Sequence, residues 1–186
     1  FPTRRSSDLR TYTQDLSNPL IPPKSDGQIV VSSVNIEENG QRQPVNYVLP
    51  PGISRMFDSS QPQLLQQNEQ ALSMKITDLS PADARAVYKS TAYDLRRYKR
   101  LQMFAHAEAP IDESKTLSNG DFSVFIRLGS DYKNNYYEYE VPLDLTPHST
   151  ILYNTNNSAD QEKVWPLNNT LNFKLETLTD LKLERN

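Results

Sequence analysis

The sequence predicts a mainly β protein whose centre is a β-sandwich of the jelly-roll type. Apolar and polar residues alternate over several short segments, which is the pattern of half-buried strands. Asn-Gly pairs at 39–40 and 119–120 mark tight turns next to such segments. A charged, tyrosine-marked turn at 94–100 leads directly into another alternating segment. Together these observations favour short strands joined by turns.

Composition divides the chain into four parts. Residues 1–9, FPTRRSSDL, match the translation of a common sequencing-adapter oligonucleotide, so we exclude them from the fold as an artefactual segment. Such a start also predicts that the chain is a piece of a longer reading frame. The other predicted parts are an extended lead-in with a β-hairpin and a polar connection at 10–69, the β-sandwich core at 70–147, and an Asn-rich loop with a short helix at 148–186.

The lead-in is predicted to hold one hairpin. Its proline-rich start at 17–23 favours extended backbone. Residues 28–36 then alternate as a strand, with a slip at 32–33 that a β-bulge would explain. Asn39-Gly40 predicts the turn, because both residues tolerate positive φ, and residues 43–49 form the second strand.

The core is predicted from four segments with a period of two. The clearest has Val124 and Ile126 on one face. A marked turn before a central strand is similar to galactose-binding-like jelly rolls, a likeness of fold that assigns no ligand. The four segments are 70–77, 101–108, 122–128 and 136–143.

Residues 80–89 carry two conflicting signals. Ser80-Pro81-Ala82-Asp83 resembles a helix capping box with proline at the first helical position. Val87 and Tyr88 favour a strand instead. We expect a turn followed by a strand.

The C-terminal part is predicted to end in a short amphipathic helix. Leu175, Leu178 and Leu181 recur at helical spacing, and the helix should end near Arg185. Trp165 is expected to fix this part onto the sandwich, because buried tryptophans usually serve packing. A stacking platform for a sugar is the alternative for the same ring.

Composition argues against several classes of function. A net charge of −3 and a mean hydropathy of −0.70 disfavour a nucleic-acid partner. The absence of cysteine excludes a disulfide scaffold, a thiolate zinc site and a cysteine nucleophile. The sequence contains no run of about 18 apolar residues, so no transmembrane helix is predicted. The basic cluster at 96–100 is expected to be a solvated face.

No catalytic residue, cofactor site or metal site is predicted, and we expect no enzyme activity. His106 and His148 fit no zinc-ligand spacing, and His106 is expected to be a structurally hydrogen-bonded histidine. Glu138 and Glu140 share a strand face at about 7 Å, a separation found in inverting glycosidases. Solvent-facing glutamates are the expected interpretation.

Loop oxygens leave one weaker alternative. Asp121, Asp131 and Asn134 stand at predicted strand ends and could coordinate calcium. They lack the spacing of an EF-hand.

Tyrosine is abundant, with ten in the chain. Aromatics at high density suit a recognition surface or an edge packed on a neighbouring domain. The apolar ring can cover the neighbour while the hydroxyl stays wet, so we expect intramolecular docking ahead of ligand binding. The predicted docking surface comprises Tyr132, Tyr136, Tyr137, Tyr139 and Trp165.

Several short sequence segments, here called words, follow one another in a fixed order and carry a resemblance to a known family. They are NPLIPP at 18–23, NYVLPPGISR at 46–55, DARAVYK at 83–89, YKRLQMFAHAE at 98–108, FIRLGSDYKNNYYEYEVPL at 125–143 and LKLERN at 181–186. On these words the chain resembles the SprA (Sov) family of Bacteroidetes, the outer-membrane translocon of the type IX secretion system. No single word decides this, but their shared order argues against chance.

The resemblance implies a soluble, non-catalytic structural module of that translocon, which supports protein secretion and gliding motility. The implied location is the outer membrane, at the cell surface or the periplasmic face. The implied partners are the rest of the same large chain, the plug and partner proteins of the secretion system, and the secreted cargo proteins. No nucleic acid and no cofactor are expected. The alternative is a free-standing carbohydrate-binding β-sandwich module.

Overall fold

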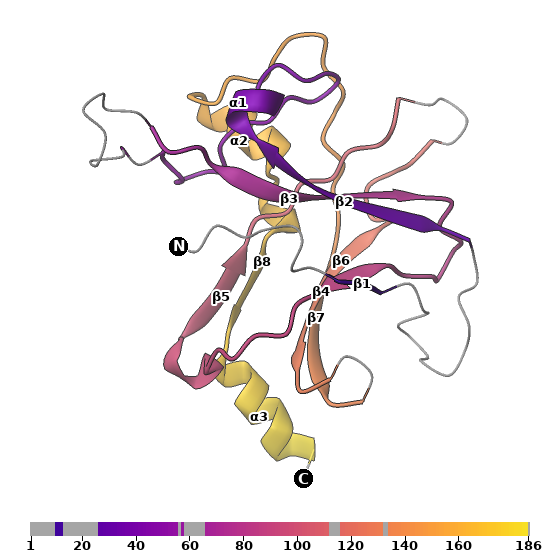
Figure 1. The fold of residues 1–186 in the computed structure, drawn as a ribbon, viewed down its shortest axis with the longest axis vertical. Helices are drawn as coiled ribbons and strands as arrows, with labels where there is room; N and C mark the ends of the chain where they lie inside the picture. The colour runs from indigo at the N-terminus through magenta and orange to yellow at the C-terminus, as the bar shows by residue number, and fades with distance from the viewer. Residues whose placement is uncertain are drawn as a thin grey trace. The chain divides into compact units, whose positions relative to one another are not determined.

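The computed structural model shows a mainly β chain (Figure 1). It describes residues 10–12, 26–55, 57, 66–111, 116–131 and 134–185, so the predicted segments at 1–9 and 17–23 lie outside the described residues. The strands are β1 (Arg10–Tyr12), β2 (Gln28–Asn35), β3 (Gln70–Thr77), β4 (Ala86–Tyr88), β5 (Arg100–Met103), β6 (Ser123–Gly129), β7 (Tyr136–Pro142) and β8 (Leu171–Lys174). The helices are α1 (Ile36–Asn39), α2 (Ser158–Val164) and α3 (Glu176–Arg185), with 3-10 turns η2 (Leu95–Arg97) and η3 (Leu167–Asn169). None of the helices in the described ranges has the length and apolar character needed to cross a membrane.

The chain folds as two compact units. Unit 1 comprises Phe1–Val34 with Gln70–Tyr93, and unit 2 comprises Asn35–Glu69 with Asp94–Asn186. The described strands form four two-stranded sheets, β1-β4, β2-β3, β5-β8 and β6-β7. The mainly β fold class is therefore confirmed.

Unit 1 contains three of the predicted strands. β2 has two consecutive exposed residues at Ser32 and Ser33, where the sequence pattern slips. β4 pairs antiparallel with β1, with Thr11 opposite Val87. The strand predicted for the end of the 80–89 segment is thus confirmed, and the helix alternative is wrong.

The hairpin predicted at Asn39-Gly40 is wrong. β2 pairs with β3 instead, and α1 follows β2 directly. The side chain of Asn35 caps this helix by accepting a 2.8 Å bond from the Glu38 amide, while the Asn35 amide donates to Asn39 Oδ1 at 3.0 Å. These local bonds favour a helical turn over a β-turn. Residues 43–49 form no strand.

Unit 2 contains the predicted antiparallel pair β6-β7, in which Ile126 lies opposite Tyr139. The strand predicted at 101–108 ends early, at Met103, and its partner β8 was not predicted. The two pairs contact each other through the rings of Tyr139 and Phe173, whose centroids are 4.8 Å apart. This contact joins one sheet face to the other.

A helix ending at Arg185 is confirmed as α3, but the predicted amphipathic character is wrong, because apolar and polar residues of α3 do not separate onto two faces. Leu175, just before α3, is buried, whereas Leu181 is exposed. α2 was not predicted. Its N-cap is Asn157, whose side chain accepts bonds from the amides of the first helical turn.

The core of unit 2 gathers around a segment that belongs to no strand or helix. Val45 and Val48 are 1% and 0% exposed, and Val164 and Leu171 are equally well covered at 2% and 0%. This core is where the candidate site lies.

Candidate functional site

The buried segment 45–49 is held by side-chain hydrogen bonds and by one backbone bond, in which the Tyr47 amide donates to the Asn39 carbonyl at 2.9 Å. Asn46 bonds the backbone of Tyr153 twice, accepting from its N–H at 2.8 Å and donating to its carbonyl at 2.9 Å. The Leu49 amide donates to Thr155 Oγ1 at 2.9 Å. Unpaired backbone groups in a core are costly, so these side chains pair buried backbone groups, as the hydrogen bonds between strands do in a sheet.

Trp165 closes the other side of this segment. Its indole N–H donates to the Val48 carbonyl at 2.9 Å, and the residue is only 7% exposed. Three rings meet its ring edge-on, with centroids 6.0 Å (Tyr47), 6.5 Å (Phe104) and 5.8 Å (His106) away. We call Tyr47, Val48, Phe104, His106 and Trp165 the Trp165 junction.

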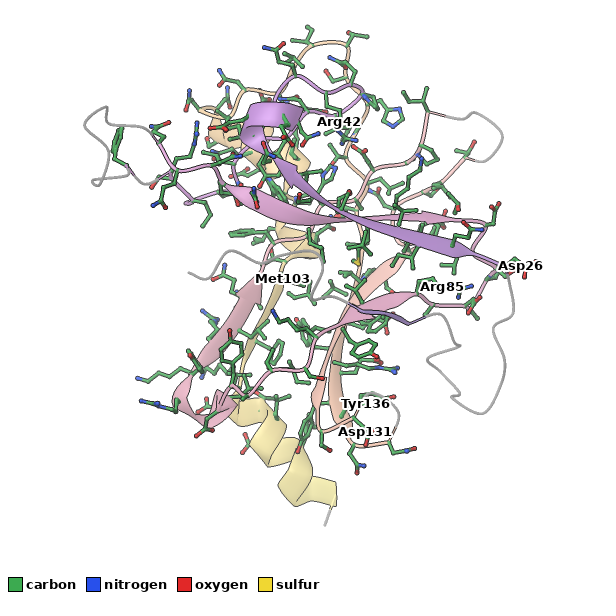
Figure 2. The ribbon with its side chains drawn as sticks, in the orientation of Figure 1. Asp26, Arg42, Arg85, Met103, Asp131 and Tyr136 are labelled. Carbon is green, nitrogen blue, oxygen red and sulfur yellow. The ribbon has the colours of Figure 1, made fainter. Side chains whose placement is uncertain are left out.

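A charged cluster covers the edge of the junction. His106 Nδ1 lies 2.8 Å from the Val164 carbonyl oxygen, and its Nε2 lies 3.3 Å from Glu108 Oε2. Arg42, which follows α1 (Figure 2), donates from both terminal nitrogens to both oxygens of Glu108 at 2.6 Å. Such bidentate pairs combine charge with fixed geometry. The cluster therefore joins three segments that are distant in sequence.

Two pKa shifts reflect this packing. Burial acts to raise the pKa of Glu108, but the hydrogen bonds from His106 and Arg42 outweigh it and leave the pKa below its ordinary value. Burial also raises the pKa of Tyr47, and the hydrogen bond to Glu69 raises it further, far above the ordinary value. Tyr47 therefore remains a neutral donor.

The polar atoms in the junction are occupied by partners within the chain. The buried hydroxyl of Thr146 donates to the carbonyls of Lys163 and Val164 at 3.2 and 3.3 Å, and lies 3.1 Å from His106 Nδ1. His106 is thus hydrogen-bonded structurally, as predicted. The arrangement therefore crosslinks segments that are distant in sequence.

The predicted docking surface is only partly brought together. Tyr136 packs against the guanidinium of Arg127, 4.0 Å from its ring centroid, and Tyr139 packs on Phe173. Tyr136, Tyr137 and Tyr139 are half-buried on β7. Trp165 is buried in the junction and contacts other rings, and Tyr132 lies outside the described residues.

The acidic candidates are engaged in local structure. Glu138 pairs with Arg127, and Glu140 accepts a hydrogen bond from Ser123. Asp131, at the turn beside Tyr136 (Figure 2), accepts bonds from the amides that follow it. In the described ranges no group of three or more His, Cys, Asp or Glu residues could hold a metal ion.

Asp121 and Asn134, the other two calcium candidates, also take part in turns. Asp121 accepts a 2.7 Å bond from the Ser118 amide, and the Asn134 amide donates to Asp131 at 2.6 Å. These bonds give each residue a structural role in its own loop.

Sequence reasoning missed the residues that organise the two units. In unit 2 these are Arg42, Asn46 and Thr146, whose partners lie far away in sequence. In unit 1 Arg85 forms a buried ion pair with Asp83 at 2.9 Å and donates to the Gly27 carbonyl at 2.8 Å. The only available signal was that several of these residues fall inside the words that carry the family resemblance.

Comparison with known protein families agrees with those words. A family model named SprA_N, described as a motility related/secretion protein, matches residues 5–186. The chain belongs to the SprA_N family. The recognition of the SprA family from sequence is thereby confirmed, although no curated protein matches the chain. The SprA_N match overlaps part of the segment 1–9, so the extent of adapter-derived sequence stays a prediction.

Proposed function

We propose that this chain is a non-catalytic structural module of a SprA-like translocon. The family establishes a motility- or secretion-related protein. The proposal adds a role at the outer membrane, at the cell surface or the periplasmic face. There the module would support protein secretion through the type IX system and gliding motility.

One observation carries this proposal. The family words meet in the Trp165 junction, where NYVLPPGISR supplies Tyr47 and Val48, and YKRLQMFAHAE supplies Phe104 and His106. Their side chains are used for packing and for hydrogen bonds within the chain. Side chains that pack and hydrogen-bond within the chain support a structural role more than a catalytic one.

The proposed partners are the rest of the same long chain, the plug and partner proteins of the secretion system, and the cargo. Half-buried Tyr136 and Tyr137 keep ring area available for such docking. A jelly-roll sandwich, completed by further strands, is the fold proposed for the assembled module. The contact between the tilted rings of Tyr139 on β7 and Phe173 on β8 supports it.

The carbohydrate-binding alternative draws no support from Trp165. A sugar platform needs an exposed aromatic face, and this ring is 7% exposed with its N–H bonded to Val48.

The test is a variant series in the full-length protein, in cells that otherwise lack it. Glu108→Gln and His106→Ala remove the cluster's charges or hydrogen bonds, and Leu167→Ala, at an 82% exposed position, is the control. Secreted cargo and gliding are measured beside the amount of folded, full-length protein in the membrane fraction.

A structural module predicts that secretion falls only in proportion to the folded protein. Glu108→Gln that abolishes secretion at a normal level of folded protein would instead indicate a chemical role for the cluster. Normal secretion from a protein whose module has been unfolded would reject any role in the translocon.

A further inference from the structure

The turn that precedes β5 forms an exposed basic surface on a chain that is acidic overall. Arg97, Lys99 and Arg100 are all exposed there, whereas the whole chain carries a net charge of −3. Lys174 of β8 lies directly opposite Arg100 in the ladder. Residues opposite one another share a sheet face, so two cations stand side by side. This turn lies at the end of the β5-β8 pair from which α3 leaves (Figure 1).

Counter-charges among the described residues do not account for the cluster. Lys174 pairs with Glu176 at 3.2 Å, but within the described part of the chain no carboxylate forms an ion pair with Arg97, Lys99 or Arg100. Like charges directly opposite one another destabilise a strand pair. An external anion would relieve that repulsion.

The same turn exposes an apolar tip. The Tyr98 amide donates to the Leu95 carbonyl at 3.1 Å, an i to i+3 bond that places both side chains on one side of the turn. Tyr98 is 58% exposed and Leu95 is 36% exposed. An exposed aromatic and an exposed aliphatic side chain therefore lie within the same six residues, 95–100, as the three cations.

We propose that this basic turn, which comprises Leu95 and Tyr98 together with Arg97, Lys99 and Arg100, binds an anionic lipid surface. Arginine matches phosphate oxygens with paired donors, and lysine adds a point charge. Tyrosine favours the boundary between headgroups and acyl chains, with its hydroxyl in water. An acidic polypeptide would use the charges but would leave the apolar tip in water, so the lipid surface fits both features.

The experiment measures binding of the 186-residue chain to vesicles of equal parts phosphatidylglycerol and phosphatidylcholine, with pure phosphatidylcholine as reference. Arg97→Gln with Arg100→Gln removes two charges from the turn, and Tyr98→Ser removes the ring. The matched control, Lys75→Gln with Lys163→Gln, removes two exposed charges elsewhere. Emission from Trp165, the single tryptophan, checks that each variant is folded.

We expect the charge variant to bind the anionic vesicles about 25-fold more weakly, since each cation near such a surface contributes about 1 kcal/mol. Binding should also weaken as salt shortens the Debye length from about 30 Å to about 3 Å. Tyr98→Ser should lose about tenfold through the missing ring area, and the control should bind as the parent does.

Two outcomes overturn the proposal. Equal binding by the parent and the charge variant means that the turn is not the contact. The second outcome has two parts: Tyr98→Ser binds vesicles normally, and the charge variant loses affinity both for vesicles and for immobilised poly-glutamate. That result would identify an acidic polypeptide as the partner.

Discussion

Replacing Trp165 by alanine should remove most of the stability of unit 2. The ring is buried against three other rings, and removing a buried Trp side chain costs about 3–5 kcal/mol. The Val48 carbonyl also loses its donor, which adds about 1–3 kcal/mol for an unsatisfied buried group. The sum, about 4–8 kcal/mol, is comparable to the whole stability of many domains, about 5–15 kcal/mol.

The assay is urea unfolding followed by far-ultraviolet circular dichroism, because the variant has no tryptophan left for fluorescence. Trp165→Phe separates the two contributions. It keeps most of the ring packing and should cost nearer to the carbonyl penalty alone, about 1–3 kcal/mol. The control is Leu167→Ala, at a position 82% exposed, which should change stability by no more than about 0.5 kcal/mol.

The reasoning is refuted if Trp165→Ala unfolds at the same urea midpoint as Leu167→Ala. That result would mean that the ring contributes no packing energy and that the Val48 carbonyl finds another donor.

Four further predictions concern other residues. Folding lowers the pKa of Glu108, so the contribution of this carboxylate to stability is complete above its ordinary pKa of 4.5 and is lost as the pH falls through the folded-state pKa. Over that acidic range the urea midpoint should fall less in Glu108→Gln than in the parent protein. Arg85→Met should destabilise unit 1 by about 3–5 kcal/mol by removing the cation that pairs with buried Asp83 at 2.9 Å, and adding Asp83→Ala should recover part of that loss in thermal unfolding. Tyr139→Ser should lower the thermal unfolding midpoint, because it removes the contact with the Phe173 ring. Tyr137→Ser should reduce secretion by the full-length protein while leaving its stability unchanged. Normal secretion by the Tyr137→Ser protein would contradict the docking role of this residue.

Local patterns predicted the elements whose partners are close in sequence. β6 and β7 follow from strict alternation across one turn at 129–135, and α3 follows from leucines at helical spacing. The hairpin at Asn39-Gly40 failed because Asn35, three residues before Glu38, caps a helical turn by accepting from the Glu38 amide. That spacing is visible in the sequence, but the prediction used the Asn-Gly pair alone.

The site could not be predicted in the same way. β5 pairs with β8 about seventy residues later, and nothing in either segment specifies the other. Trp165 was expected to serve packing, but its contacts with Val48 and His106 depend on three segments meeting in space. Arg42 carries no local sign of its pairing with Glu108, because a surface arginine and an interface arginine look alike in sequence.

The buried segment 45–49 limits the order in which parts of the protein can fold. Its hydrogen-bond partners, Tyr153, Thr155 and Trp165, are more than a hundred positions further along the chain. During synthesis or export from the N-terminus, this apolar stretch therefore stays uncovered until Trp165, more than a hundred positions later, has emerged. Closing so long a loop is also entropically costly and tends to be slow. The nascent chain should need a holding chaperone at this stretch, and release from that chaperone should coincide with the arrival of Trp165.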